Sequence, residues 1–153
     1  MGIEFTLGNQ ILLLSCLSWF LAQCTKGILQ KITEGVFSLQ RCLASGGMPS
    51  SHSALVTCCA ATTGELYGFD SGMFAIAAIV AIVVMYDACN VRRQSGEQAK
   101  AINLILKDWR QSGEITPELL NLQVKVLLGH TPLQVVCGAI LGLCVSIIGV
   151  NLL

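Results

Sequence analysis

Uncharged stretches alternate with charged connections along the chain, and four of them cover residues 5–25, 42–64, 71–86 and 131–153. A helix that crosses the hydrocarbon core of a bilayer needs roughly 20 mainly apolar residues, at about 1.5 Å of rise per residue. The first and last stretches reach this length, and the third is shorter but almost wholly aliphatic. The second contains several threonines and ends at Glu65, so we expect a short helix that other helices bury.

This pattern predicts an all-α fold, a polytopic membrane helix bundle of about four transmembrane helices with additional interfacial helices. The whole chain of 153 residues forms one membrane domain in this interpretation, with spans at roughly residues 7–27, 50–67, 71–90 and 131–152. Residues 92–128 form the interfacial helical region. Gly113 interrupts that region, and Thr116 and Pro117 are residue types that begin a second helix, which runs to residue 128.

The composition is typical of a membrane protein and excludes two other classes. Charged residues make up 12% of the chain, about half the share of an ordinary soluble domain, and hydrophobic residues make up 54%. So few charges cannot cover the surface of a soluble domain. The formal net charge is zero, whereas a nucleic-acid-binding protein carries a basic excess that neutralises phosphates. We therefore expect the bilayer, and no nucleic acid, among its partners.

All nine Lys and Arg residues fall in the first and third connections between the predicted spans. With four spans these two connections lie on one side of the membrane, and the positive-inside rule makes that side cytoplasmic, with both termini outside. The residues before Ile11 include no Lys or Arg, so the first segment lacks the basic start of a secretory signal. We expect that segment to remain as a helix of an integral, multi-pass membrane protein.

Two further patterns concern packing. The eight cysteines show no C-x-x-C pair or metal-ligand spacing, so we interpret most of them as small apolar residues within helices. The last stretch contains Gly138-x-x-x-Gly142, a spacing that lets two helices approach closely. This contact serves either packing within the chain or a homo-oligomer.

The two histidines of the chain each stand in a Gly/Pro turn at the mouth of a predicted span. His52 follows a Gly-Gly-Met-Pro turn, and His130 lies within a Gly-His-Thr-Pro turn. The predicted topology places both on the basic side, together with Lys26, Asp87, Arg92 and Arg93. Ionisable groups at the edge of a membrane are costly to bury, so their clustering predicts a functional site. Two adjacent arginines alone are also typical of a topology anchor beside lipid headgroups.

Two imidazoles, several fixed cations and the N-terminus of a helix together predict a phosphate site. Guanidinium groups and free helix N–H groups hold phosphate oxygens. A neutral imidazole can attack phosphorus, and a second, protonated imidazole can give its proton to the leaving oxygen. Histidine suits both tasks because its unperturbed pKa lies near neutrality. This chemistry needs neither a metal ion nor another cofactor, so we expect none.

Four strings of residues carry a resemblance to a known family. They are GGMPSSHS at 46–53, YDACNVRR at 86–93, GEQA at 96–99 and LGHTP at 128–132. They resemble the divergent branch of the type 2 phosphatidic acid phosphatase superfamily, which is related to acid phosphatases and vanadium-dependent haloperoxidases. The likeness runs over nearly the whole chain and implies a membrane hydrolase that works through a phosphohistidine.

By this resemblance, His130 is the nucleophile and His52 is the acid that protonates the leaving group. The phosphate oxygens are held by Lys26, Ser50, Ser51, Arg92 and Arg93. Lys31 is a rival for the place of Lys26, because the residues that follow Lys26 depart from the family pattern. Ser51 stands where the superfamily motif has glycine.

Gln134 stands where the superfamily has an acidic partner for the nucleophilic histidine. A carboxylate there orients the ring and stabilises the imidazolium, whereas a neutral amide accepts a hydrogen bond but supplies no charge. Gln134 is therefore a candidate for orienting the nucleophile. Asp87, at the end of the third predicted span, is a candidate catalytic carboxylate that substitutes for the missing acid.

The leading hypothesis is a membrane phosphatase or phosphotransferase that acts on a lipid or isoprenoid phosphate through a histidine nucleophile. The apolar bundle would hold the tail of the substrate, and the basic mouth would hold its headgroup. The alternative is a non-catalytic membrane scaffold or lipid-phosphate-binding protein with a degenerate phosphatase site. A transporter or channel subunit fits less well, because the sequence shows no inverted repeat and no charge in the middle of a span.

Overall fold

The computed structural model describes residues 7–35, 47–113, 116, 119, 122–126 and 129–152. Within these ranges every regular element is helical. The helices are α1 (Leu7–Glu34), α3 (Ser51–Tyr67), α4 (Gly72–Tyr86), the π-helix η1 (Asp87–Val91), α5 (Arg92–Ser112) and α6 (Pro132–Leu152). The protein is thus an all-helical membrane bundle, as the hydrophobic pattern predicts.

Among the described residues, three helical stretches are long and apolar enough to cross a membrane: Gln10–Thr33, Gly72–Ser112 and Pro132–Leu152. The fourth helix of the bundle, α3, has only 17 residues. It contacts α1, α4 and α6, and most of its residues between Ala54 and Gly64 are buried. The neighbouring helices therefore cover much of α3, the helix that contains the threonines.

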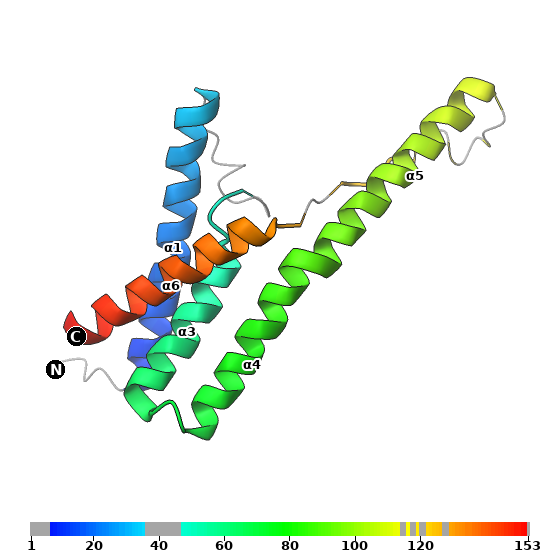
Figure 1. Ribbon diagram of the computed structural model, residues 1–153. Coiled ribbons are helices and arrows are strands. Elements are labelled where there is room, and N and C mark those ends of the chain that lie inside the picture. The colour runs from blue at the N-terminus through cyan, green and yellow to red at the C-terminus, as the bar shows by residue number, and fades with distance from the viewer. Residues whose placement is uncertain are drawn as a thin grey trace.

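The helices α1, α3, α4 and α6 run in alternating directions (Figure 1). The C-terminal part of α1 and the first turns of α3 and α6 lie toward one end of the bundle. The turn between α3 and α4 and the C-terminal end of α6 lie toward the opposite end. This alternation brings the two histidine-bearing turns to the same end of the molecule.

Gly138 and Gly142 let α6 pack directly on α3. A Cβ atom added at Gly138 would overlap the carbonyl oxygen of Ser50, and one added at Gly142 would overlap the carbonyl oxygen of Ala54. Two helices approach this closely only where small residues face the neighbouring backbone. Of the two uses that the Gly-x-x-x-Gly spacing allows, the structure shows packing within the chain.

The core lies between α1, α3 and α6. Leu14, Cys58 and Val145 form its buried apolar cluster. Thr62 and Ser146 are completely buried and join α3 to α6 through a hydrogen bond of 2.9 Å between their hydroxyl oxygens. Interhelical bonds of this kind contribute about 0.6 kcal/mol on average in membrane proteins. They hold α3 and α6 in one register.

The helices α4, η1 and α5 continue as one rod, Gly72–Ser112, of 41 residues, and α5 extends away from the rest of the bundle (Figure 1). At about 1.5 Å per residue this rod is roughly 60 Å long, twice the thickness of the hydrocarbon core. The sequence pattern alone predicts that the region after residue 91 lies in the plane of the interface. In the structure, η1 widens the helix without breaking it, so α5 keeps the direction of α4.

The chain returns from the far end of α5 beside the same helix. The side-chain amide of Asn103 donates to the carbonyl oxygen of Val124 at 2.8 Å, and its oxygen accepts from the Val124 amide at 2.9 Å. Residues 122–126 have no regular secondary structure, so the second interfacial helix expected to run to residue 128 is absent there. The Asn103 side chain takes the place of helical hydrogen-bond partners for Val124.

Candidate functional site

The first turn of α3 is tied to the first turn of α6. Ser50 caps α3, and its hydroxyl oxygen accepts from the Ser53 amide at 3.4 Å and from the Ser53 hydroxyl at 2.9 Å. The Ser50 amide donates to the carbonyl oxygen of Gln134 at 2.9 Å. Ser50 is completely buried, so its described contacts are those of a helix cap and of a link between two helices.

Lys26 reaches this turn from α1. Lys26 is 7% exposed, and its ammonium nitrogen donates to the hydroxyl oxygen of Ser51 at 3.3 Å. Its aliphatic carbons lie 3.9 Å from the position of a Cβ atom at Gly47. Lys26 lies in α1, which continues without a break to Glu34, beyond the predicted end of the first span. Lys31, the rival candidate on the same helix, is exposed.

The π-helix η1 and the start of α5 anchor the segment that carries His130. The His130 amide donates to the carbonyl oxygen of Ala88 at 3.0 Å. Gly129 packs on the main chain of α5, since a Cβ there would lie 2.8 Å from the carbonyl carbon of Arg92 and from Cα of Arg93. Only glycine fits so close an approach. Arg93 and His130 are far apart in sequence, yet the fold brings their main chains together.

Gln134 fixes the tautomer of the His130 ring. Its side-chain oxygen Oε1 accepts from the Thr131 amide at 3.1 Å and lies 3.2 Å from Nδ1 of His130. A backbone N–H can only donate, so the amide atom that faces Thr131 must be the oxygen. That oxygen can only accept, so Nδ1 of His130 carries the proton. The free lone pair of the His130 ring is therefore on Nε2, and a nucleophilic attack by His130 would come from this nitrogen.

The His130 ring is buried among cationic groups, and the residue is 5% exposed. Burial is the largest influence and lowers the pKa of His130, while the hydrogen bond with Gln134 opposes this and raises it. The charges of Lys26, His52 and Arg92 lower the pKa further. The ring is therefore neutral at neutral pH. These three groups therefore lie near enough to His130 to influence the charge of its ring.

Asp87 forms an ion pair with Arg92, at 2.6 Å between Oδ2 and the guanidinium Nε. A π-helical turn closes on the fifth residue, which brings positions 87 and 92 toward the same side of the helix. The described partner of the His130 ring is Gln134, and the described partner of Asp87 is Arg92. The geometry thus gives Asp87 a contact with the guanidinium of this cluster.

His52 lies in the first turn of α3 and is exposed, next to the buried site. An exposed imidazole can exchange protons with solvent, whereas the buried ring of His130 cannot do so freely. A neutral ring with a free lone pair, an exposed second imidazole and two fixed cations can together bind an oxyanion and transfer a phosphoryl group. Among the residues that the structure describes, no group of three His, Cys, Asp or Glu side chains is placed to hold a metal ion.

Three features of this site are missed by reasoning from the sequence. They are the Ala88 carbonyl that holds His130, the contact of Gly129 with the main chain of α5, and the Thr131 amide that donates to the same Gln134 oxygen as the His130 ring. The glycine directly before His130 is the one signal that points to a close approach there. A π-helix is also frequent at functional sites, although its sequence carries no reliable mark.

Comparison with known proteins agrees with this architecture. Residues 7–145 match the family described as "Divergent PAP2 family". The chain is 35% identical over 149 residues to the uncharacterized membrane protein YuiD of Bacillus subtilis (strain 168), and this similarity covers 93% of the chain and 94% of the relative. No solved structure gives a significant match. The matched region includes both histidine-bearing turns, the π-helix and nearly all of the bundle, and the chain therefore belongs to the divergent PAP2 family.

Proposed function

We propose that the protein is a membrane phosphatase or phosphotransferase that acts on lipid or isoprenoid phosphates, with His130 as its nucleophile. The observation that supports this most strongly is the neutral ring of His130, protonated on Nδ1, among Lys26, His52 and Arg92. A free imidazole lone pair next to fixed cations is what attack on a phosphate ester requires. Membership of the divergent PAP2 family agrees with this chemistry.

In the first step, the phosphate oxygens lie against Lys26, Ser51 and the two arginines that begin α5. Nε2 of His130 attacks phosphorus, so an N–P bond forms while the ester P–O bond breaks. The leaving oxygen takes a proton from His52. A phosphate dianion next to His52 favours the protonated form of that ring, because opposite charges stabilise each other.

In the second step, water attacks the phosphohistidine. His52 takes the proton from this water, the N–P bond breaks, and inorganic phosphate leaves with His130 restored. If an alcohol replaces water, the same step transfers the phosphoryl group to that alcohol. Ser50 contributes by holding the turn that carries Ser51 and His52, and Asp87 contributes by fixing the guanidinium of Arg92.

The outer surface of the bundle supports a lipid substrate. On α4, Ile76 is 67% exposed, Ile79 is 61% exposed and Ile82 is 63% exposed. Such a surface faces lipid in a membrane protein and ends at η1, whose carbonyl holds the His130 segment. A lipid phosphate can therefore keep its tail in the bilayer while its phosphate reaches the imidazole.

The purified protein in detergent, offered a panel of lipid phosphates, should release inorganic phosphate. His130→Ala should abolish this release while the variant elutes from a sizing column as the wild type does. Brief incubation with a radiolabelled substrate should also give an acid-labile phosphoenzyme that forms on the wild type and not on His130→Ala. A phosphoenzyme that persists in His130→Ala would contradict the assignment of the nucleophile.

The two lysines of α1 provide a matched pair for the phosphate-binding proposal. Lys26→Ala removes the buried ammonium that contacts Ser51, so we expect kcat/KM to fall by about a hundredfold. Lys31→Ala removes an exposed charge from the same helix and should leave kcat/KM within about twofold. Equal losses in the two variants would count against Lys26.

One observation favours a second candidate, a non-catalytic lipid-phosphate-binding protein. The contact of the His130 ring is the neutral amide of Gln134, which supplies no charge to an imidazolium or a phosphohistidine. For such a protein, the wild type and His130→Ala would bind lipid phosphates with equal affinity, and neither would hydrolyse them. Release of phosphate by the wild type alone excludes this candidate.

A further inference from the structure

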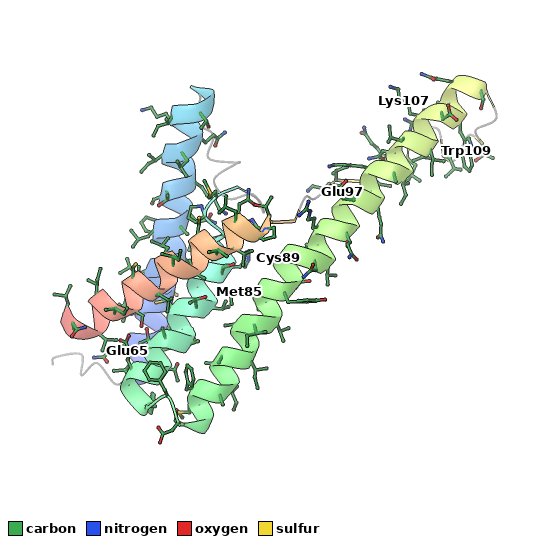
Figure 2. The ribbon with its side chains drawn as sticks, viewed as in Figure 1. Glu65, Met85, Cys89, Glu97, Lys107 and Trp109 are labelled. Atoms are coloured by element: carbon green, nitrogen blue, oxygen red, sulfur yellow. The ribbon has the colours of Figure 1, made fainter. Side chains whose placement is uncertain are left out.

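A hollow opens beside the histidine cluster, where η1, α5 and the start of α6 meet. It has a volume of about 500 Å³, and its lining includes Asn90, Arg93, Gln94, Glu97, Gln98 and Pro132. Figure 2 shows Glu97 near the segment that leads into α6, with Cys89 closer to α4 along the same rod. We call this hollow the amide groove.

Three carboxamides line the groove. Gln94 and Gln98 are four residues apart in α5, so they lie on one face of that helix, one turn apart, and Asn90 lines the same hollow from η1. Each carboxamide offers two N–H donors and one oxygen acceptor. Glu97 adds a carboxylate, whose Oε1 accepts from Lys100 at 3.0 Å and which keeps further acceptor positions.

The hydrogen-bonding groups of the amide groove differ from those of a phosphate site. Phosphate oxygens accept hydrogen bonds and carry negative charge, so they favour cations and N–H donors. The amide groove contains one cation, Arg93, but otherwise combines donors with acceptors and includes the carboxylate of Glu97, which repels phosphate. A hydroxyl group both donates and accepts, so neighbouring hydroxyls are the groups that match such a lining.

The amide groove adjoins the place where the phosphate lies in the proposed reaction. Arg93 lines the groove, and its main chain contacts Gly129, the residue directly before His130. Pro132, the first residue of α6, also lines the groove and lies two residues after His130. A substrate with its phosphorus at Nε2 of His130 therefore has neighbouring atoms within reach of the groove.

We propose that the amide groove binds the hydroxyl groups of a polyol in the leaving group, so that the preferred substrates are lipids with a phosphorylated polyol headgroup. This inference rests on the proposed function and narrows its substrate class. A phosphate attached directly to an isoprenyl chain or to diacylglycerol offers the carboxamides no hydroxyl partner. Such a substrate forms no hydrogen bonds with the carboxamides, whereas the hydroxyls of a polyol form several.

Selectivity between two substrates tests the proposal. Phosphatidylinositol 4-phosphate carries hydroxyls around its phosphate, and phosphatidic acid has none beside it. In the same mixed micelles, we expect the wild type to favour the inositol lipid in kcat/KM. Gln94→Leu and Gln98→Leu should each lower the ratio of the two kcat/KM values by about tenfold, since each removes hydrogen bonds made to one substrate only.

Gln111→Leu is the matched control, because Gln111 is an exposed glutamine near the far end of α5. It should leave both kcat/KM values and their ratio unchanged. A wild type without preference for the inositol lipid, or a ratio that stays the same in Gln94→Leu and Gln98→Leu, would overturn the proposal.

A binding measurement separates this inference from the proposed reaction. The His130→Ala variant should bind phosphatidylinositol 4-phosphate in nanodiscs more tightly than phosphatidic acid, and adding Gln94→Leu should remove that difference. If the wild type shows no hydrolysis but this binding difference is present, the proposed reaction fails and the groove is supported. If hydrolysis occurs without any binding difference, the groove fails and the reaction stands.

Discussion

Two N–H groups converge on the side-chain oxygen of Gln134, and they decide which nitrogen of His130 is available. The Thr131 amide can only donate, which identifies the facing atom as oxygen and assigns the proton of the ring to Nδ1. Gln134 thus orients the imidazole ring, as the carboxylate of a catalytic triad does. It does not stabilise the imidazolium by charge, since an amide is neutral.

Gln134→Glu supplies the missing negative charge with a side chain of the same shape. We expect the pKa of His130 to rise, because a carboxylate stabilises the imidazolium, and the acid limb of the kcat/KM profile to move to higher pH. On the alkaline plateau kcat should increase by about tenfold or more. A pH–rate profile and an NMR titration of the ring measure these effects. Gln134→Leu, which accepts no hydrogen bond, should lower kcat, and an unshifted profile in Gln134→Glu would refute the argument.

The burial of His130 also couples the stability of the fold to pH. The pKa of His130 is lowered from 6.5 by burial in the folded protein, so below about pH 6.5 the unfolded chain binds the proton more readily. The stabilising contribution is complete above that pH and is lost as the pH falls toward the lower pKa of the folded state. The apparent Tm in detergent should therefore drop between about pH 7 and pH 5. His130→Gln should flatten this dependence, and an equal slope in wild type and variant would contradict it.

At the scale of the elements, the contact of α6 with α3 and the wide turn of η1 build the site. Gly138 brings the first turns of α6 against the carbonyl of Ser50, next to the hydrogen bond between Ser50 and Gln134. On the other side, η1 offers the Ala88 carbonyl to His130. The histidine segment is therefore held from two directions by main-chain groups.

Gly138→Ala tests the first of these contacts. The added Cβ would overlap the carbonyl oxygen of Ser50 and force α6 away from α3, so we expect a loss of roughly 1–3 kcal/mol in stability together with reduced activity. Thermal unfolding in detergent and phosphate release measure the two effects. Gly72→Ala is the control, because a Cβ at Gly72 meets no atom within 4 Å. Similar losses in both variants would show that close packing at Gly138 is not the cause.

At the scale of the whole molecule, the alternating helices place the histidine cluster at one end and the C-terminal end of α6 at the other (Figure 1). The α5 rod extends from the cluster end and carries Lys107 and Trp109 far from the bundle (Figure 2). The lysines and arginines of α5 favour the cytoplasmic side of a membrane. We therefore propose that the site and α5 face the cytoplasm.

Tags at two places test this orientation. In intact cells, a tag after Leu152 should be reached by an impermeant reagent from outside, whereas a tag beside Gly113, at the far end of α5, should be protected. Inverted vesicles should give the reverse result, because the positive-inside rule places the basic rod in the cytoplasm. Detergent-solubilised protein, in which both tags are accessible, is the control. A C-terminal tag that only permeabilised cells expose would place the site outside.

The sequence by itself determined the helical class and the position of most helices. Long uncharged stretches force main-chain groups to bond within a helix, because lipid offers them no partner, and α4 and α6 begin within a residue of their predicted starts. The two histidine turns were also readable, since both contain glycine and proline next to an ionisable residue. The end of α1 could not be predicted in the same way, because the residues up to Glu34 are polar enough to resemble a connection.

Only the tertiary structure decided how the site is assembled. The choice of Lys26 over Lys31 for the contact with Ser51 depends on how α1 packs against α3, and the partner of Val124 is a side chain 21 residues away. The tautomer of His130 follows from an oxygen that also accepts the Thr131 amide. Local patterns specify helices through bonds within one segment, whereas these contacts join distant segments and depend on packing that no local pattern records.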